Sequence, residues 1–106
     1  MSDSLIFSTL KSTGLPCCYS HFRNEQGNTQ EPPYIVYIGN GQNVLDADNT
    51  HYWRKNRYQV EYYFKLKNEA NEASIEDALL NAGFIYEKSE DNYIEEQNVF
   101  VIYYFI

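Results

Sequence analysis

Four residues carry the side chains most able to bind a metal ion or to attack a substrate: Cys17, Cys18, His21 and His51. The two cysteines are neighbours, and on an extended strand they would point to opposite faces, so at most one of them could share a site with His21. Structural zinc needs four ligands, and a catalytic cysteine needs an oxyanion hole and an orienting group, which the nearby sequence does not indicate. We therefore expect reduced thiols, no metal and no cofactor.

Carboxylates are frequent, but their spacing predicts neither a catalytic pair nor a calcium loop. Asp46 and Asp48 belong to a stretch rich in Asn, Asp and Gly, where such residues usually form turns and supply too few oxygen ligands for calcium. The sequence Gly39-Asn40-Gly41 lacks the lysine and the following helix of a phosphate-binding loop. Because no catalytic constellation is present in the sequence, we expect that the protein is not an enzyme.

The overall charge opposes binding to nucleic acid. The 106 residues include 15 Asp and Glu against 8 Lys and Arg, which gives a formal net charge of −7. Affinity for phosphates depends on Lys and Arg, so we expect no specific nucleic-acid binding. No apolar stretch approaches the roughly 18 residues of a membrane span, and residues 1–4 lack the features of a signal peptide, so we expect a cytosolic chain without a membrane partner. Length and composition indicate one domain over residues 1–106.

Two local blocks of charge are more informative than the total. Arg54, Lys55 and Arg57 form a basic block, and residues 87–96 form an acidic block. In a head-to-tail assembly, the basic block of one copy can face the acidic block of the next, because opposite charges fix the register of a contact. The alternative is that both blocks are unrelated, solvent-exposed segments. The acids of the second block are Glu87, Glu90, Asp91, Glu95 and Glu96.

Hydrophobic periodicity and chain-breaking residues predict two helices and five strands in the order α-β-β-β-α-β-β. This order is typical of an α+β fold in which a mainly antiparallel sheet carries two helices on one face. The expected helices contain residues 5–10 and 75–82, the second ending at Gly83; the expected strands are 16–22, 34–38, 58–66, one that begins at 84–86, and 99–106.

The last of these strands is apolar on both faces. Phe100 and Ile102 would face one way, and Val101, Tyr103 and Phe105 the other. Two short helices can cover only one face of a sheet. We therefore expect the second face to be covered by the rest of the domain or by another subunit, which favours self-association.

Residues 42–53 are predicted to form a loop that is long for a hairpin connection. The segment is rich in Asn and Asp and ends in the aromatic pair Tyr52-Trp53. Long loops in compact domains are usually functional, so we expect this one to project from the sheet and to contact a neighbouring subunit or a partner through Trp53. The alternative is that Trp53 belongs to the core of its own subunit.

Several short segments, taken in their order and spacing over most of the chain, carry a resemblance. They are residues 13–16 with Tyr19 and Phe22, 32–37, 47–49 with Tyr52, 58–63 with 67–68, 75–79, and 93–96. In these segments the chain resembles the small tail-completion or tail-terminator proteins of long-tailed phages and prophages of Gram-positive bacteria. It departs from them at Phe64, where a polar Thr is expected, and at the cysteine pair, where a Val-Ala type of strand is usual.

The resemblance implies a structural subunit that forms a ring, expected to be a hexamer, at the head-proximal end of the tail tube. The implied partners are other copies of the chain, the major tail tube protein, and a head connector or head-completion protein. The implied location is the head-tail junction of the virion, after assembly in the host cytoplasm.

Two alternatives from other functional classes remain open. One is a small acidic inhibitor or nucleic-acid mimic that acts on a host enzyme, and the other is a ligand-binding regulatory domain, which would need an apolar pocket. For the ring, the predicted subunit or tube interface comprises Asp46, Asp48, Tyr52, Trp53, Arg54, Lys55, Arg57, Glu90, Asp91, Glu95, Glu96, Tyr103 and Phe105.

Overall fold

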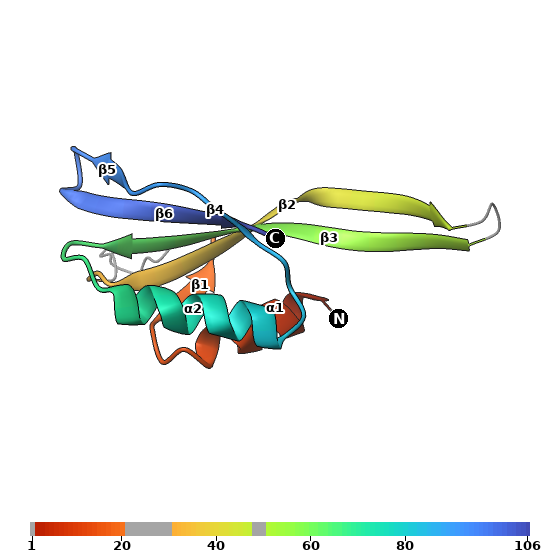
Figure 1. The fold of residues 1–106 in the computed structure, drawn as a ribbon. Coiled ribbons are helices and arrows are strands. Elements are labelled where there is room, and N and C mark those ends of the chain that lie inside the picture. Colours follow the sequence, from red (N-terminus) through yellow and green to blue (C-terminus); the bar gives the residue numbers. More distant parts are fainter. Residues whose placement is uncertain (1, 21–30, 48–50) are drawn as a thin grey trace.

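A computed structural model describes residues 2–20, 31–47 and 51–106, with the side chains of residues 2–4, 43–47 and 51–55 left undescribed. The described chain contains two helices and six strands, an α+β fold (Figure 1). The elements are α1 (Ser2–Lys11), β1 (Cys17–Tyr19), β2 (Tyr34–Ala47), β3 (His51–Phe64), α2 (Glu69–Asn81), β4 (Glu87–Lys88), β5 (Asn92–Ile94) and β6 (Val99–Phe105).

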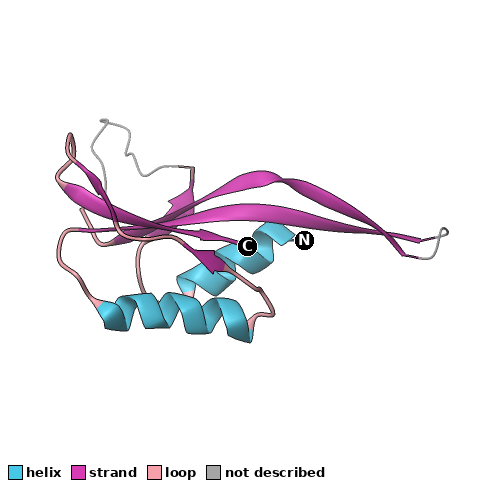
Figure 2. Ribbon diagram, turned by 45° about the horizontal axis from the view of Figure 1, so that its top comes forward, coloured by secondary structure: helices cyan, strands magenta, loops and turns pink. Residues whose placement is uncertain are grey.

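The strands form one sheet in the order β1-β2-β3-β6-β4, and β5 also pairs with β6. Every pairing is antiparallel except that of β1 with β2, which is parallel. Both helices lie on the same side of the sheet (Figures 1 and 2). The predicted α+β class, with a mainly antiparallel sheet and helices on one face, is therefore confirmed.

Local sequence accounts for the boundaries of α2. The side chain of Asn68 caps the helix by accepting a hydrogen bond from the Asn71 backbone at 3.1 Å. At the other end, Gly83 adopts a positive φ of 93°, and the backbone N–H of Phe84 donates to the Leu79 carbonyl at 2.9 Å. This is the glycine-terminated helix end that the sequence predicts at Gly83.

The core lies between the helices and one face of the sheet. Ile6 and Leu10 of α1 and Ile75 and Leu79 of α2 are fully buried there. Their spacing of three or four residues puts each pair on one side of its helix, so each helix presents one apolar stripe to the sheet. The sheet residues of the core are Ile35, Tyr37, Tyr58, Val60, Tyr62, Phe64, Ile102, Tyr104 and Ile106.

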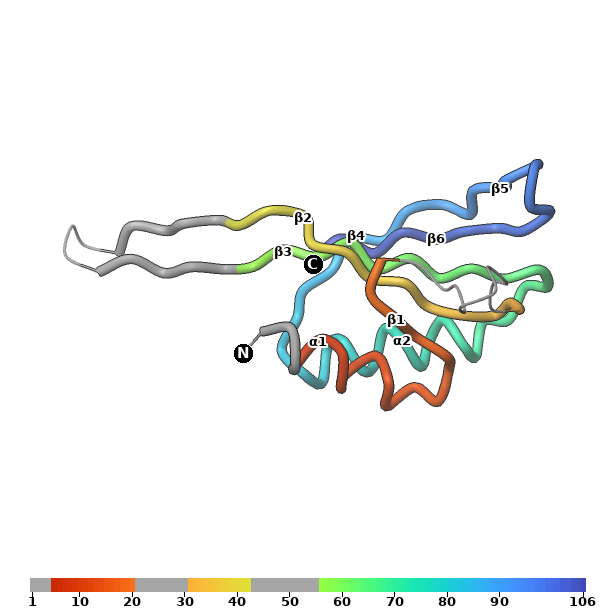
Figure 3. Tube along the Cα trace, turned by 180° about the vertical axis from the view of Figure 1, so that it is seen from behind, coloured from red at the N-terminus to blue at the C-terminus, as the bar shows by residue number. Residues whose placement is uncertain are grey.

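β2 and β3 continue together beyond the rest of the sheet (Figure 1). Tyr58 exchanges backbone hydrogen bonds of 3.3 and 3.0 Å with Ile106, and β6 ends there, next to the C-terminus (Figure 3). From this point residues 42–47 of β2 pair only with residues 51–56 of β3 among the described strands. We call these two paired segments the arm.

The arm corrects the prediction of a loop over residues 42–53. All of these residues that the structure describes lie in β2 or β3, with pairs from Gln42 opposite Asn56 to Ala47 opposite His51. Asn, Asp and Gly have low strand propensity, but propensity in a strand depends on context, and pairing with a partner strand outweighs composition here. The prediction that this segment projects from the sheet agrees with the path of the arm.

Two smaller expectations also differ from the structure. The predicted strand at residues 84–86 begins instead at Glu87, and residues Asn92–Ile94 form an additional short strand, β5. Both β4 and β5 pair with the same edge of β6, and between them the Ser89 hydroxyl accepts a hydrogen bond from the Tyr103 backbone at 2.9 Å. Their short lengths leave too little periodicity to read from the sequence.

Candidate functional site

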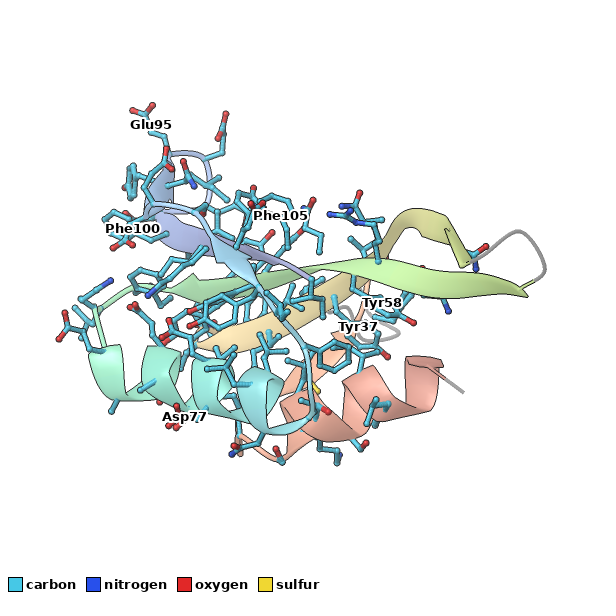
Figure 4. The ribbon with its side chains drawn as sticks, turned by 45° about the vertical axis from the view of Figure 1, so that its right-hand side comes forward. Tyr37, Tyr58, Asp77, Glu95, Phe100 and Phe105 are labelled. Carbon is cyan, nitrogen blue, oxygen red and sulfur yellow. The ribbon has the colours of Figure 1, made fainter. Side chains whose placement is uncertain are left out.

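The face of the sheet opposite the helices carries a regular array of side chains, which we call the helix-free face. Alternation along each strand assigns its members, and the cross-strand register arranges them in rows. One row contains Tyr34, Tyr63 and Val101; the next contains Val36, Glu61 and Tyr103; the third contains Ile38, Gln59 and Phe105. Figure 4 shows Phe105 on this side and Tyr37 and Tyr58 on the side of the helices.

Aromatic side chains dominate the helix-free face. The rings of Tyr34 and Tyr63 stack with centroids 5.0 Å apart, and those of Tyr103 and Phe105 stack at 6.2 Å. All four side chains are half-buried, between the fully buried core and the open surface. An apolar ring body with a polar tip suits a surface that another protein covers. Both residues predicted for this surface, Tyr103 and Phe105, therefore lie side by side on it.

Glu61 is the acidic centre of this face. Its carboxylate accepts hydrogen bonds of 2.7 Å from the Tyr63 hydroxyl and from the Gln59 amide. Burial raises the pKa of Tyr63 above its ordinary value, and the hydrogen bond to Glu61 adds to the rise. Within the described part of the chain, Glu61 has no cationic partner. The carboxylate is thus held in place by neutral donors.

The arm carries most of the predicted basic block. In the strand register Asp46 lies opposite Tyr52, and Trp53 lies opposite Leu45. Arg54 and Lys55 follow on the same strand, opposite residues 44 and 43. Asp48 and His21, also singled out in the sequence, lie outside the described residues, and nothing is shown of the His51 side chain.

Arg57 lies at the base of the arm and differs in position from the two basic residues beyond it. It alternates with Tyr58, which faces the helices, so it belongs to the helix-free face in line with Gln59. Its side chain is half-buried and makes no ion pair with any residue of the described ranges. The structure therefore places Arg57 on the same face as Tyr103 and Phe105.

The acidic block follows the other edge of the sheet, from β4 to the turn after β5. We call its five acids, Glu87, Glu90, Asp91, Glu95 and Glu96, the acidic edge. All are exposed, and of these Asp91 alone forms an ion pair within the described residues, with Lys67 at 3.0 Å. Glu95 lies at the end of the molecule opposite the arm (Figure 4). The far end of the acidic edge is thus well separated from the arm, whereas Glu87 pairs with Phe105, which lies opposite Gln59 near the base of the arm.

A second charged cluster, which the sequence analysis did not identify, joins α2 to β4 and β6. Glu72 is almost fully buried and contacts Lys67 at 2.7 Å and Lys88 at 3.0 Å. Lys88 also contacts Glu76 at 2.7 Å, and Glu76 accepts a hydrogen bond from the Tyr104 hydroxyl at 2.9 Å. This network fixes the position of β4, the start of the acidic edge, against α2.

Glu76 is the titratable centre of that network. Burial by itself would raise the pKa of Glu76, but hydrogen bonds from Lys88 and Tyr104 and the charge of Lys88 outweigh it and hold that pKa below its ordinary value. The sequence places Glu72 and Glu76 four residues apart on one helix, a signal for a shared face, but it does not reveal that Lys88 lies across from them.

A cleft of about 630 Å³ lies between the end of β3 and the start of α2, lined in part by Pro32, Phe64 and Lys65. Its other polar groups are already engaged, because the Asn71 amide donates to the Tyr62 hydroxyl at 3.1 Å and Lys67 is held by Glu72 and Asp91. A ligand site needs convergent polar groups that are available to the ligand.

The cysteines belong to β1 and are free thiols, and burial raises the pKa of Cys17. Among the described residues no three His, Cys, Asp or Glu side chains are grouped so as to hold a metal ion. Within the same ranges, neither helix has the length and apolar character needed to cross a membrane.

Comparison of the chain with protein-family models, with curated proteins and with solved structures finds no match.

The network predicts how stability depends on pH. Because the pKa of Glu76 is lower in the folded chain than in the unfolded chain, its stabilising contribution is present above the unfolded value, about 4.3, and is lost as the pH falls through the folded value. Glu76→Gln should therefore be less stable than wild type at pH 7, and its unfolding free energy should change less between pH 7 and pH 3. Urea unfolding at several pH values measures this.

The matched control is Asp77→Asn, which makes the same chemical change at the adjacent, exposed position of α2. We expect its pH profile to follow wild type. A Glu76→Gln profile parallel to wild type over the acid range would show that the Lys88–Glu76 pair does not stabilise the fold.

Proposed function

We propose that the chain is a structural subunit of a ring that terminates the tail tube of a long-tailed phage and joins it to the head connector. The proposal rests on the family resemblance and on one observation, the arm. A two-stranded ribbon by itself is marginally stable in water at best, and the arm pairs with no other described strand of its subunit. A partner that covers the arm would supply the missing stabilisation.

The charge distribution favours another copy of the chain as that partner. The arm carries Arg54 and Lys55, while Glu95, at the far end of the acidic edge, lies at the opposite end of the same subunit (Figure 4). Such a separation suits head-to-tail contacts, in which one surface meets a different surface on the next copy, and these contacts close into rings. A hexamer is the copy number that the family resemblance implies.

The acidic inhibitor is the alternative that predicts a different behaviour. An inhibitor of a host enzyme would be monomeric until it meets its target and would not need its arm to contact another copy. The size of the protein in solution and with tail tubes therefore separates the two functions.

Charge reversal tests the head-to-tail contact. Arg54→Glu with Lys55→Glu should raise the concentration needed for half-maximal assembly roughly tenfold, because both residues would then face acids. Adding Glu95→Lys and Glu96→Lys to the same chain should restore much of the loss. Sedimentation velocity at several protein concentrations measures the assembly.

The control for this series is Lys11→Glu with Lys65→Glu, which makes the same change in net charge at exposed positions outside the arm. Assembly should be retained in the control. A chain that is monomeric at all concentrations, with or without tail tubes, would remove the ring.

Trp53 is the residue that we propose as a docking anchor. Its backbone lies in the arm, opposite Leu45 and beyond Tyr58, the first core residue of β3 among those whose side chains the structure describes. Large aromatic residues often dominate the energetics of interfaces. Trp53→Ala should therefore impair the joining of heads to tails, measured as infectious particles, while the melting temperature of the free subunit changes by at most a few degrees.

Tyr62→Phe serves as the comparison, because it removes a buried hydroxyl that bonds Asn71 and should lower the melting temperature while leaving particle formation by folded protein intact. If Trp53→Ala instead melts far below wild type and its folded fraction still joins heads to tails, Trp53 is a core residue and the docking role is wrong.

A further inference from the structure

We propose that the helix-free face binds a second copy of this chain about a two-fold axis that passes over Gln59, so that Arg57 of each copy pairs with Glu61 of the other. This contact uses a different surface from the arm and the acidic edge. It therefore goes beyond the proposed ring function and stands or falls separately.

Arg57 and Glu61 carry opposite charges on this face, and neither has an oppositely charged partner within the described chain. Glu61 receives hydrogen bonds from Tyr63 and Gln59, both neutral, and Arg57 forms no ion pair within the described chain. Both side chains are half-buried. A partly desolvated charge is costly unless an opposite charge compensates it, so each of them favours a partner that supplies the other sign.

The two charges lie too far apart on their strand to compensate each other directly. Arg57 and Glu61 are separated by four residues of β3, which spans about 13 Å at 3.3 Å per residue. Both alternate with core residues and so point to the same face, two residues either side of Gln59. The spacing is symmetric about Gln59, with opposite signs at its two ends.

The symmetric spacing of Arg57 and Glu61 indicates which partner binds the helix-free face. A two-fold axis over Gln59 exchanges position 57 of one copy with position 61 of the other, so a single contact forms two ion pairs between Arg57 and Glu61. A partner of arbitrary sequence would need to carry the complementary pattern, whereas a second copy carries it by construction. Charge complementarity thus selects a second copy of the chain.

The surroundings of the charges suit such a contact. Ile38 and Phe105 flank Gln59 in its row, with the exposed Glu87 beyond Phe105 at the edge of the sheet, and Tyr103 lies beside Glu61 in the next row. Apolar and aromatic side chains around a few paired charges are typical of protein interfaces. Two sheets packed face to face lie about 10 Å apart, a distance that extended Arg and Glu side chains can bridge together.

Charge exchange between the two positions tests the pairing. Arg57→Glu and Glu61→Arg should each raise the dissociation constant of the dimer at least tenfold, because each single change places like charges together twice. The double variant, Arg57→Glu with Glu61→Arg, restores opposite charges and should regain most of the affinity. Analytical ultracentrifugation measures the constants, with circular dichroism as the check that each variant is folded.

Two controls make matched changes in charge on the helix side of the sheet, Lys11→Glu on α1 and Asp77→Arg on α2, and should leave the dimer intact. Reversal of Arg54 and Lys55 should also leave it intact, so a loss of the ring and a loss of this dimer are distinguishable. If a single variant does not fold, Arg57→Gln and Glu61→Gln replace it and should weaken the dimer less.

Cross-linking tests the two-fold axis itself. In a chain with Cys17→Ser and Cys18→Ser, Gln59→Cys should react with a short bis-maleimide to give a dimer linked through position 59 of both copies, whereas cysteine at Asp77 should not. A wild-type protein that is monomeric at high concentration, a double variant no tighter than the single ones, or the absence of the 59–59 product from a chain that still dimerises would each overturn the proposal.

Discussion

The pairing of β3 with two strands along half of its length, and with one strand along the rest, determines the architecture. Where β3 has both β2 and β6 beside it, Tyr58, Val60 and Tyr62 meet the helices and form the core. Beyond the backbone hydrogen bonds between Tyr58 and Ile106, which follows the last residue of β6, the same strand continues with β2 alone. One strand therefore contributes both to the core of the subunit and to the arm, which we propose a partner covers.

The two faces of the same strand also differ, because one contributes to the core and the other carries charged side chains. Its even-numbered residues from Tyr58 face the helices, while Arg57 and Glu61 lie on the helix-free face. Both helices cover one face, and the other carries the half-buried aromatic side chains of Tyr34, Tyr63, Tyr103 and Phe105. The network around Glu72 and Lys88 holds β4, the start of the acidic edge, to α2.

The long periodic elements could be predicted from the sequence. The alternation of residues 58–66 indicated the part of β3 that enters the core, and Gly83 marked the end of α2, because each signal is local. The arm could not be predicted, since its Asn and Asp residues favour turns and only pairing with the opposite strand makes them extended. The position of Glu61 among aromatic side chains could not be predicted. A carboxylate in an alternating strand is typical of the solvent-facing side, and its neighbours in the sheet depend on the long-range register of the strands.

Backbone hydrogen exchange in the arm tests the central claim, that the arm is stable only when a partner covers it. In the free subunit, amides that pair residues 43–47 with 51–55 should exchange rapidly, while those of residues 60–64 are protected by the core. In the assembled state, exchange in the arm should slow to a rate close to that of residues 60–64. Protection of the arm in the free subunit equal to that of the core, or rapid exchange of the arm after assembly, would contradict this account.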